Sequence, residues 1–306
     1  MARWENVELD ASRDRGQWDT WGVQDAEISD GWLLLHLRKR RIYAPLAHPE
    51  LPHQFARTAL RHRTLTAFVS HYGRLGWHEL TERQSNQLRF SGSGSWLKSK
   101  FEEHLSLLDK LDARSALGAY AEPLEWIRAH AETVGWCLQA GFELREKSGR
   151  RLEVVCERLI EQLPSQVGWR PTIGKTPEAL LQRRNRTAID VVGGLMQTYL
   201  STNLEGVRRR IQYRDGSLYS MWGGETLIES IYTLVSNAVT GGRLSQCESC
   251  GAVFLKTDER QRFCPKREGQ AKSPCMNRER VQRQRHKSTG EKEKTSGGKA
   301  KRARRR

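Results

Sequence analysis

The spacing of hydrophobic residues near the N-terminus predicts a strand followed by a helical segment. The apolar run Trp32–Leu37 follows Asp30-Gly31, a pair typical of a tight turn, and together they indicate a turn and a strand. Between residues 54 and 69, apolar residues recur at three- and four-residue spacing, which is the period of an amphipathic helix. Gly73 and Gly76 are expected to end this segment.

Further helices are predicted across the middle of the chain, where apolar residues keep to one face of each segment. The expected segments are Trp96–Leu111, Pro123–Leu138, Arg151–Leu163, one that begins at Thr176-Pro177, and Glu225–Val239. Gly193 and Gly194 are expected to perturb the helical pattern after Thr176. Val207–Tyr219 instead alternates polar and apolar residues around Asp215-Gly216, which predicts a β-hairpin. We therefore expect residues 1–243 to form a mostly helical body with a short strand region and one β-hairpin.

Four of the six cysteines lie within 29 residues near the C-terminus. A Cys-x-x-Cys pair comes first, then a third cysteine after thirteen residues and a fourth after ten more: Cys247, Cys250, Cys264 and Cys275. A tight turn between the first two directs both thiolates at one ion, and Gly251 has the backbone freedom such a turn needs. Four thiolates are the usual ligands of structural zinc and leave no position for a catalytic water. The spacing predicts one structural Zn²⁺.

The residues around these cysteines agree with a zinc site. Lys256, Arg260, Arg262 and Lys266 lie between the ligands, where their charges would offset the formal −2 of a four-thiolate centre. Ser273-Pro274 before Cys275 is the pattern of a helix N-cap, which places the last ligand in the first turn of a helix. The competing interpretation, redox-active cysteines, lacks the βαβ context of such sites. Cys137 and Cys156 stand alone in apolar patterns and are expected to be small buried hydrophobes.

The whole chain is thus expected to have an α+β fold, the helical body being followed by a small zinc module, treble-clef-like or ribbon-like, over residues 244–287. Residues 288–306 contain no apolar side chain large enough to anchor a core, so they are predicted to form a disordered basic tail. Formal net charge is +16, of which residues 276–306 carry +10, from 13 Lys or Arg against 3 Glu. Such asymmetry indicates a polyanionic partner, most simply a nucleic acid.

The module also resembles a known family. Cys247-x-x-Cys250-Gly251, Phe254, Arg262-Phe263-Cys264 and Cys275-Met276-Asn277-Arg278, followed by spaced arginines, resemble the bacterial CGNR zinc-finger proteins, described as stress-induced transcription regulators. Met276 stands where that family has a glycine, and the gap between the last two cysteines is longer than usual. The resemblance implies zinc at the four cysteines and DNA contact by the arginine-bearing helix, whose candidate contact residues are Asn277, Arg278, Arg280, Arg283, Arg285 and Lys287.

The function expected from these features is that of a zinc-finger DNA-binding transcription regulator, whose body binds a small-molecule effector or forms a homodimer. Two alternatives stay open. One is an RNA-binding factor, since arginine-rich segments also fold on RNA; the other is an enzyme of unknown activity that the finger delivers to nucleic acid. Whether the helix reads sequence or binds any polyanion through counterion release is also open. No catalytic residue is predicted.

Location is judged from the apolar runs. A membrane-spanning helix needs about 18 or more consecutive apolar residues, and the sequence has no such run. The N-terminus lacks the apolar stretch of a secretory signal. We therefore expect a cytoplasmic protein without a membrane partner.

Overall fold

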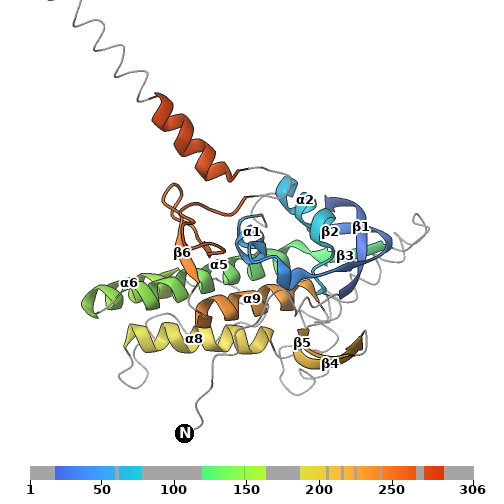
Figure 1. The fold of residues 1–306 in the computed structure, drawn as a ribbon, viewed down its shortest axis with the longest axis horizontal. Coiled ribbons are helices and arrows are strands. Elements are labelled where there is room, and N and C mark those ends of the chain that lie inside the picture. Colours follow the sequence, from blue (N-terminus) through green and yellow to red (C-terminus); the bar gives the residue numbers. More distant parts are fainter. Residues whose placement is uncertain are drawn as a thin grey trace, which may run out of the picture.

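The computed structural model describes residues 18–58, 62–77, 119–147, 149–162, 187–204, 207–214, 217–223, 226–241, 243–266 and 272–285. A three-stranded sheet lies at one end of a group of helices (Figure 1). A small unit that contains four cysteines, residues 243–266 and 272–276, packs on those helices beside the sheet and is called the cysteine unit below. The mostly helical α+β architecture expected from the sequence is seen in the described residues. None of the described helices is both long enough and apolar enough to cross a membrane.

The sheet is built around one central strand. β1 (Trp18–Ser29) and β2 (Trp32–Tyr43) form an antiparallel hairpin, and β2 also pairs with β3 (Ala119–Pro123). Asp30 and Gly31 make the turn with positive φ angles of 49° and 83°, as the sequence predicts. Residues 32–35 of β2 are all buried, which is typical of a strand covered on both faces. The predicted strand is confirmed, but it extends six residues beyond Leu37, to Tyr43.

Helices pack on one another beside this sheet. Two short ones come first, α1 (Leu51–Thr58) and α2 (His62–Tyr72), after a 3₁₀ turn at Pro45–Ala47. The longest, α5 (Leu124–Glu146), contacts the other helices α1, α6 (Gly149–Glu161), α8 (Ala188–Asn203) and α9 (Leu227–Gly241). Apolar residues on more than one face of α5 are buried, because neighbours surround it. In Figure 1, α5, α9 and α8 lie one below another as a stack.

Most of the predicted elements in the described residues are found; α5 is longer than predicted, whereas α6 and α9 have the predicted length and are displaced by two residues. The predicted helices over 123–138, 151–163 and 225–239 correspond to α5, α6 and α9, and the predicted hairpin to β4 (Arg208–Arg214) and β5 (Ser217–Gly223). The expected perturbation at Gly193-Gly194 was wrong: α8 runs through both glycines. Its start is fixed instead by a capping box, in which Thr187 and Asp190 bond to each other's backbone N–H. The helices predicted over 96–111 and from Thr176 lie outside the described residues.

A buried carboxylate ties the sheet to the loop after α2. Glu122, in β3, is fully buried and accepts hydrogen bonds from the backbone N–H groups of Leu75, Gly76 and Trp77, at 3.2, 2.6 and 3.3 Å. Gly76 has a φ of 99°, and a Cβ at this position would overlap Thr226, the residue before α9. The N–H of Ile228 donates to Leu75 O at 3.1 Å. The Glu122 carboxylate therefore holds the sheet to the loop, a backbone hydrogen bond holds the loop to α9, and no side chain fits at Gly76.

The two remaining cysteines lie in this core. Cys137 and Cys156 are buried among its apolar residues, as expected from the sequence. Burial raises the pKa of the Cys137 thiol well above its usual range and that of Cys156 to about 11, so both are neutral thiols near pH 7. They serve as small hydrophobic side chains.

Candidate metal centre and exposed basic helix

A short hairpin after α9 carries the first two cysteines of the cluster. β6 (Leu244–Gln246) pairs with β7 (Val253–Leu255), and Cys247 and Cys250 lie in the connection between them. Gly251 has a φ of 71°, and its N–H donates to Cys247 O at 2.9 Å, which closes the turn. The backbone freedom expected of Gly251 is therefore used. This turn directs the two thiols to the same point.

The other two cysteines come from the loop that follows and from a helix over residues 274–285. The N–H of Met276 donates to Ser273 Oγ at 3.2 Å and the N–H of Asn277 to Ser273 O at 3.0 Å. Ser273 is thus the N-cap, Pro274 opens the helix, and Cys275 lies in its first turn. Burial raises the pKa of the Cys275 thiol, and the positive potential at the helix N-terminus acts against that effect.

The four sulfur atoms form a group that fits one metal ion. The Sγ atoms of Cys247, Cys250, Cys264 and Cys275 all lie within 4.8 Å of one another, and those of Cys250 and Cys264 are 3.4 Å apart. A tetrahedron with metal–sulfur bonds of about 2.3 Å has sulfur–sulfur edges of about 3.8 Å, so the cluster is of the right size. Burial raises the pKa of Cys250, but hydrogen bonds from Ala252 N–H and the neighbouring thiols outweigh it and lower that pKa to about 6.

The helical body contributes an arginine to this cluster. Nη1 of Arg57, in α1, lies 3.4 Å from Cys250 Sγ and 3.5 Å from Cys264 Sγ. Partial burial lowers the pKa of Arg57, but the interactions with the cysteines outweigh it and raise that pKa above the ordinary value. A guanidinium at this distance stabilises thiolate charge, as a hydrogen-bond donor to metal-bound sulfur does. The charge compensation expected from cations between the cysteines thus comes in part from Arg57, whereas Arg262 lies 3.7 Å from Glu248.

A second contact from α1 fixes the hairpin. The ring of His53 is buried, and its Nδ1 lies 3.0 Å from Val253 O. The same ring packs edge-on against the ring of Phe254, with 6.1 Å between the ring centroids. Phe254 is fully buried and packs against the cysteines. On the other side, Gly141 in α5 approaches Val239 and Leu244 so closely that a Cβ there would lie 3.2 Å from Leu244 Cδ1. The cysteine unit is therefore packed on α1 and α5.

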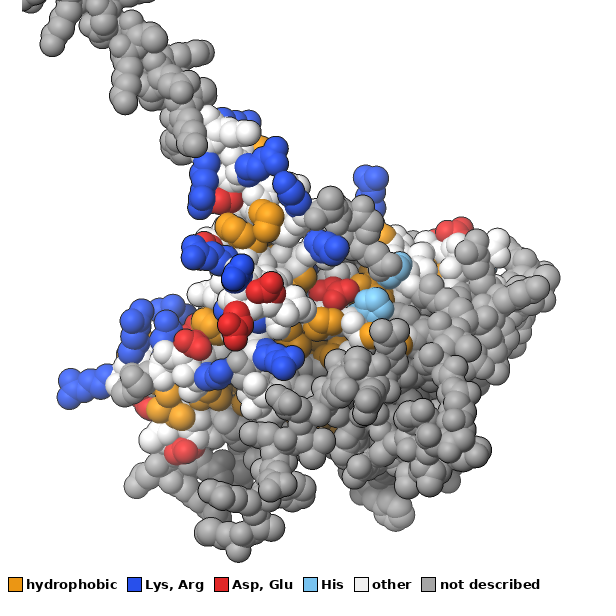
Figure 2. Space-filling view, viewed as in Figure 1, with side chains coloured by type: hydrophobic (Ala, Val, Ile, Leu, Met, Phe, Trp, Pro, Cys, Tyr) orange, Lys and Arg blue, Asp and Glu red, His pale blue; other side chains and the backbone are white. Residues whose placement is uncertain are grey.

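The helix over residues 274–285 projects from the molecule beyond the cysteines (Figure 1). Five of the six predicted nucleic-acid contacts lie on it and are exposed: Asn277, Arg278, Arg280, Arg283 and Arg285. Arg283 Nε is 3.0 Å from Glu279 Oε1, one helical turn away. Lys287 lies outside the described residues. Figure 2 shows the blue side chains gathered along this helix, whereas the unit below it carries both signs of charge.

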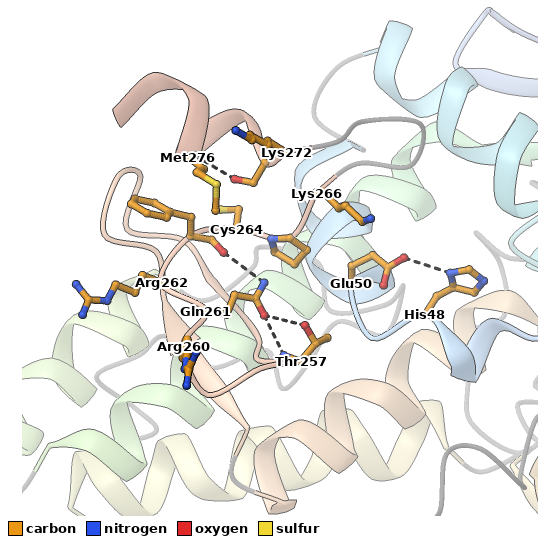
Figure 3. Close-up of a pocket in the computed structure, with 13 residues that line it drawn as sticks. His48, Glu50, Thr257, Arg260, Gln261, Arg262, Cys264, Lys266, Lys272 and Met276 are labelled. Atoms are coloured by element: carbon orange, nitrogen blue, oxygen red, sulfur yellow. Dashed lines mark hydrogen bonds and ion pairs between the residues drawn. The ribbon is translucent and has the colours of Figure 1, made fainter. Parts of the chain in front are cut away.

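A groove of about 650 Å³ opens between the body and the cysteine unit, at the start of this helix (Figure 3). His48 and Glu50, which precede α1, line one side, where His48 Nδ1 is 3.2 Å from Glu50 Oε1. The other side is formed by residues 257–266 and 272–276, whose cationic side chains in the lining are Arg260, Arg262, Lys266 and Lys272. Phe263 and Met276 add apolar surface.

Comparison with protein-family models, with curated proteins and with solved structures found no match to this chain. The resemblance of residues 244–287 to the CGNR zinc-finger proteins stays a prediction.

Sequence reasoning found the cysteines but missed their contacts with the body. Arg57 and His53 precede the cysteine hairpin by some 200 positions, as the separations of 193 between Arg57 and Cys250 and 200 between His53 and Val253 show. Nothing in the pattern around α1 distinguishes either residue from any other polar residue of an amphipathic helix. The groove was missed for the same reason, since its walls come from distant segments.

Proposed function

We propose that this protein is a zinc-finger DNA-binding protein and acts as a transcription regulator. The observation that carries the proposal is the helix over 274–285, which is anchored at its first turn by the cysteine cluster and presents exposed arginines beyond it. A helix that is polar all round and projects from the body is not a core element, so its stability and use must come from its anchor and from a partner. A polyanion is the partner its charge favours.

The four cysteines are proposed to bind one structural Zn²⁺. When bound, the ion supplies four strong bonds that hold the hairpin, the loop and the helix start together. A ligand set of four sulfurs with an arginine beside it matches the demands of zinc better than those of Mg²⁺ or Ca²⁺, which take oxygen ligands. The first pair of ligands lies in a hairpin turn and the last in a helix, which favours a treble-clef-like module over a ribbon-like one.

Duplex DNA is the favoured nucleic acid. The twelve residues from 274 to 285 make a helix about 18 Å long, and a helix fits the major groove of B-form DNA, which is about 12 Å wide. The major groove of an RNA duplex is too deep and narrow for such an approach. Arg278, Arg280 and Arg285 would contact guanine edges or phosphates, with Asn277 near the backbone. The body would bind an effector or a second copy of the chain, and a cytoplasmic location agrees with this role.

The test is a selection from random duplex DNA and random RNA pools at 0.15 M salt. Intact protein is compared with Cys250→Ser, with Arg280→Ala, and with Arg151→Ala, which changes an exposed arginine on α6 far along the chain. We expect an enriched DNA sequence for the intact protein and for Arg151→Ala. Cys250→Ser should lose it together with its zinc, and Arg280→Ala should relax the preference at one position, at a cost of about 1–3 kcal/mol.

Two outcomes would contradict the proposal. Enrichment from the RNA pool alone would identify an RNA-binding factor. Enrichment from neither pool, with retention equal in all four proteins, would remove the helix from nucleic-acid binding and direct the search to an activity of the body.

A further inference from the structure

The groove between body and cysteine unit has the charge of an anion site. Four cationic side chains line it, of which Arg262 lies 3.7 Å from Glu248. Cys264 and one carboxylate, Glu50, which is paired with His48, complete the charged part of the lining. Lys266 and Lys272 are both exposed, so their ammonium groups are available to a ligand. These two side chains flank the cysteine cluster from two separate segments, the loop after Cys264 and the residue before the N-cap Ser273 (Figure 3).

The position of the groove relates it to the projecting helix. Lys272, the N-cap Ser273 and Met276 in the first turn line the groove, so the groove lies at the helix N-terminus. The positive end of the helix dipole adds to the lysine charges at this point. An anion here would lie beside the helix rather than beyond its far end.

The geometry points to duplex DNA as the occupant: we propose that the groove receives backbone phosphates of the strand that borders the major groove entered by the helix. This inference rests on the proposed function. The helix begins at Pro274, six residues and about 9 Å before Arg280, which is more than the distance of about 6 Å from the middle of the major groove to its edge. When the middle of the helix faces base edges, its N-terminal end therefore meets the flanking backbone. Lys266 and Lys272 contact phosphates there, and the body comes to lie against the DNA through the opposite wall of the groove.

Glu50 allows a second test, in which a substitution is expected to strengthen DNA binding rather than weaken it. Its carboxylate faces the groove from the body and is largely shielded, with 22% of the side chain exposed. A phosphate in the groove is repelled by this charge. Removing the charge should tighten binding, although no contact is gained.

The experiment measures the affinity for the selected duplex at 0.05 to 0.3 M salt. Variants are Lys266→Gln with Lys272→Gln, Glu50→Gln, Arg280→Ala, and Arg151→Gln as the control. Loss of two phosphate contacts lowers the slope of log K against log salt by about 1.8 and weakens binding about 30-fold at 0.15 M. Glu50→Gln should tighten binding about threefold, as expected for one charge about 6 Å from a phosphate in water. Zinc content, measured by chelator titration, confirms that each variant keeps its metal centre.

The results separate this inference from the proposed function. If the lysine variant and Glu50→Gln both bind like Arg151→Gln while Arg280→Ala binds more weakly, the helix reads DNA and the groove holds no phosphate. If the groove variants change the affinity for an RNA hairpin but not for the duplex, the occupant is RNA and the inference is overturned. If no variant changes the affinity for any nucleic acid, the inference and the proposed function fail together.

Discussion

At Gly76 the chain passes so close to the start of α9 that no side chain fits. The residue has a φ of 99°, its N–H is bonded to the buried Glu122, and a Cβ would overlap Thr226. The N–H groups of Leu75 and Trp77 donate to the same carboxylate, so a shift of the loop would break these hydrogen bonds. Steric conflict and an unfavourable φ therefore act together at this position.

We expect Gly76→Ala to lower the free energy of unfolding by about 3 kcal/mol, from strain and overpacking combined. The matched control is Gly194→Ala in α8, where a Cβ meets nothing within 4 Å. Because alanine favours the helix over glycine, this control should be neutral or more stable by up to about 1 kcal/mol. Urea unfolding of both variants and the wild type measures the difference. Equal stability of the two variants would show that the loop relaxes.

At the scale of elements, α5 and α9 share a buried polar pair. His130 in α5 is fully buried, and its Nδ1 lies 2.9 Å from the hydroxyl of Tyr232 in α9. Trp126, one turn earlier in α5, meets the imidazole edge-on at 4.5 Å between ring centroids. Burial lowers the pKa of His130 to about 3, since the charged form has no water around it. The ring is therefore neutral in the folded protein, and its burial makes the free energy of unfolding depend on pH.

The pH dependence follows from the two pKa values of His130. In the unfolded chain that pKa is about 6.5, so between pH 6.5 and 3 unfolding takes up a proton and stability falls as the pH falls. Between pH 7.5 and 5.0 the histidine should remove about 2 kcal/mol of stability. His130→Asn has no such proton, so its unfolding free energy should fall by about 2 kcal/mol less over this interval, measured with urea. An identical fall in both proteins would mean that His130 is protonated in the folded state.

At the scale of the whole molecule, the cysteine unit is joined to the body at its cysteine cluster. Arg57 reaches Cys250 and Cys264, while His53 holds the backbone of β7. The projecting helix begins at the fourth cysteine, so its direction relative to the body is set through this contact. These contacts hold the projecting helix in a fixed orientation relative to the body.

Loss of the arginine should loosen the metal. Arg57→Gln removes the guanidinium that lies beside two of the four sulfur atoms, so we expect zinc transfer to a coloured chelator to become about tenfold faster. Arg57→Lys keeps the charge but not the planar guanidinium, so its rate of zinc transfer should lie between those of the wild type and Arg57→Gln. Arg63→Gln, an exposed position on α2, is the control. Unchanged transfer in Arg57→Gln would place Arg57 outside the control of the metal centre.

Local patterns were enough for much of the fold. The turn at Asp30-Gly31, the strand after it, α5, α6, α9 and the hairpin over 208–223 all follow from apolar periodicity and turn residues. The predicted bounds of α5 and β2 were too short because periodicity fades where a helix or strand is buried on several faces. The predicted bounds of α6 and α9 differ from the observed ones by two residues. The continuity of α8 through Gly193-Gly194 came from its capping box and its neighbours, which outweigh a weak local preference.

The cysteine cluster could also be predicted from the sequence, because the geometry of thiolate ligands restricts the spacing of the cysteines. Ser273-Pro274 likewise marks the start of the helix that carries the last cysteine. Its surroundings were decided only by the tertiary structure. Arg57 and His53 act on residues some 200 positions away because α1 packs on the cysteine hairpin. Glu122 likewise acts on the loop after α2, 45 to 47 positions away, only because β3 lies beside that loop. Local sequence carries the interactions between neighbours along the chain, whereas contacts between distant segments depend on how the elements pack.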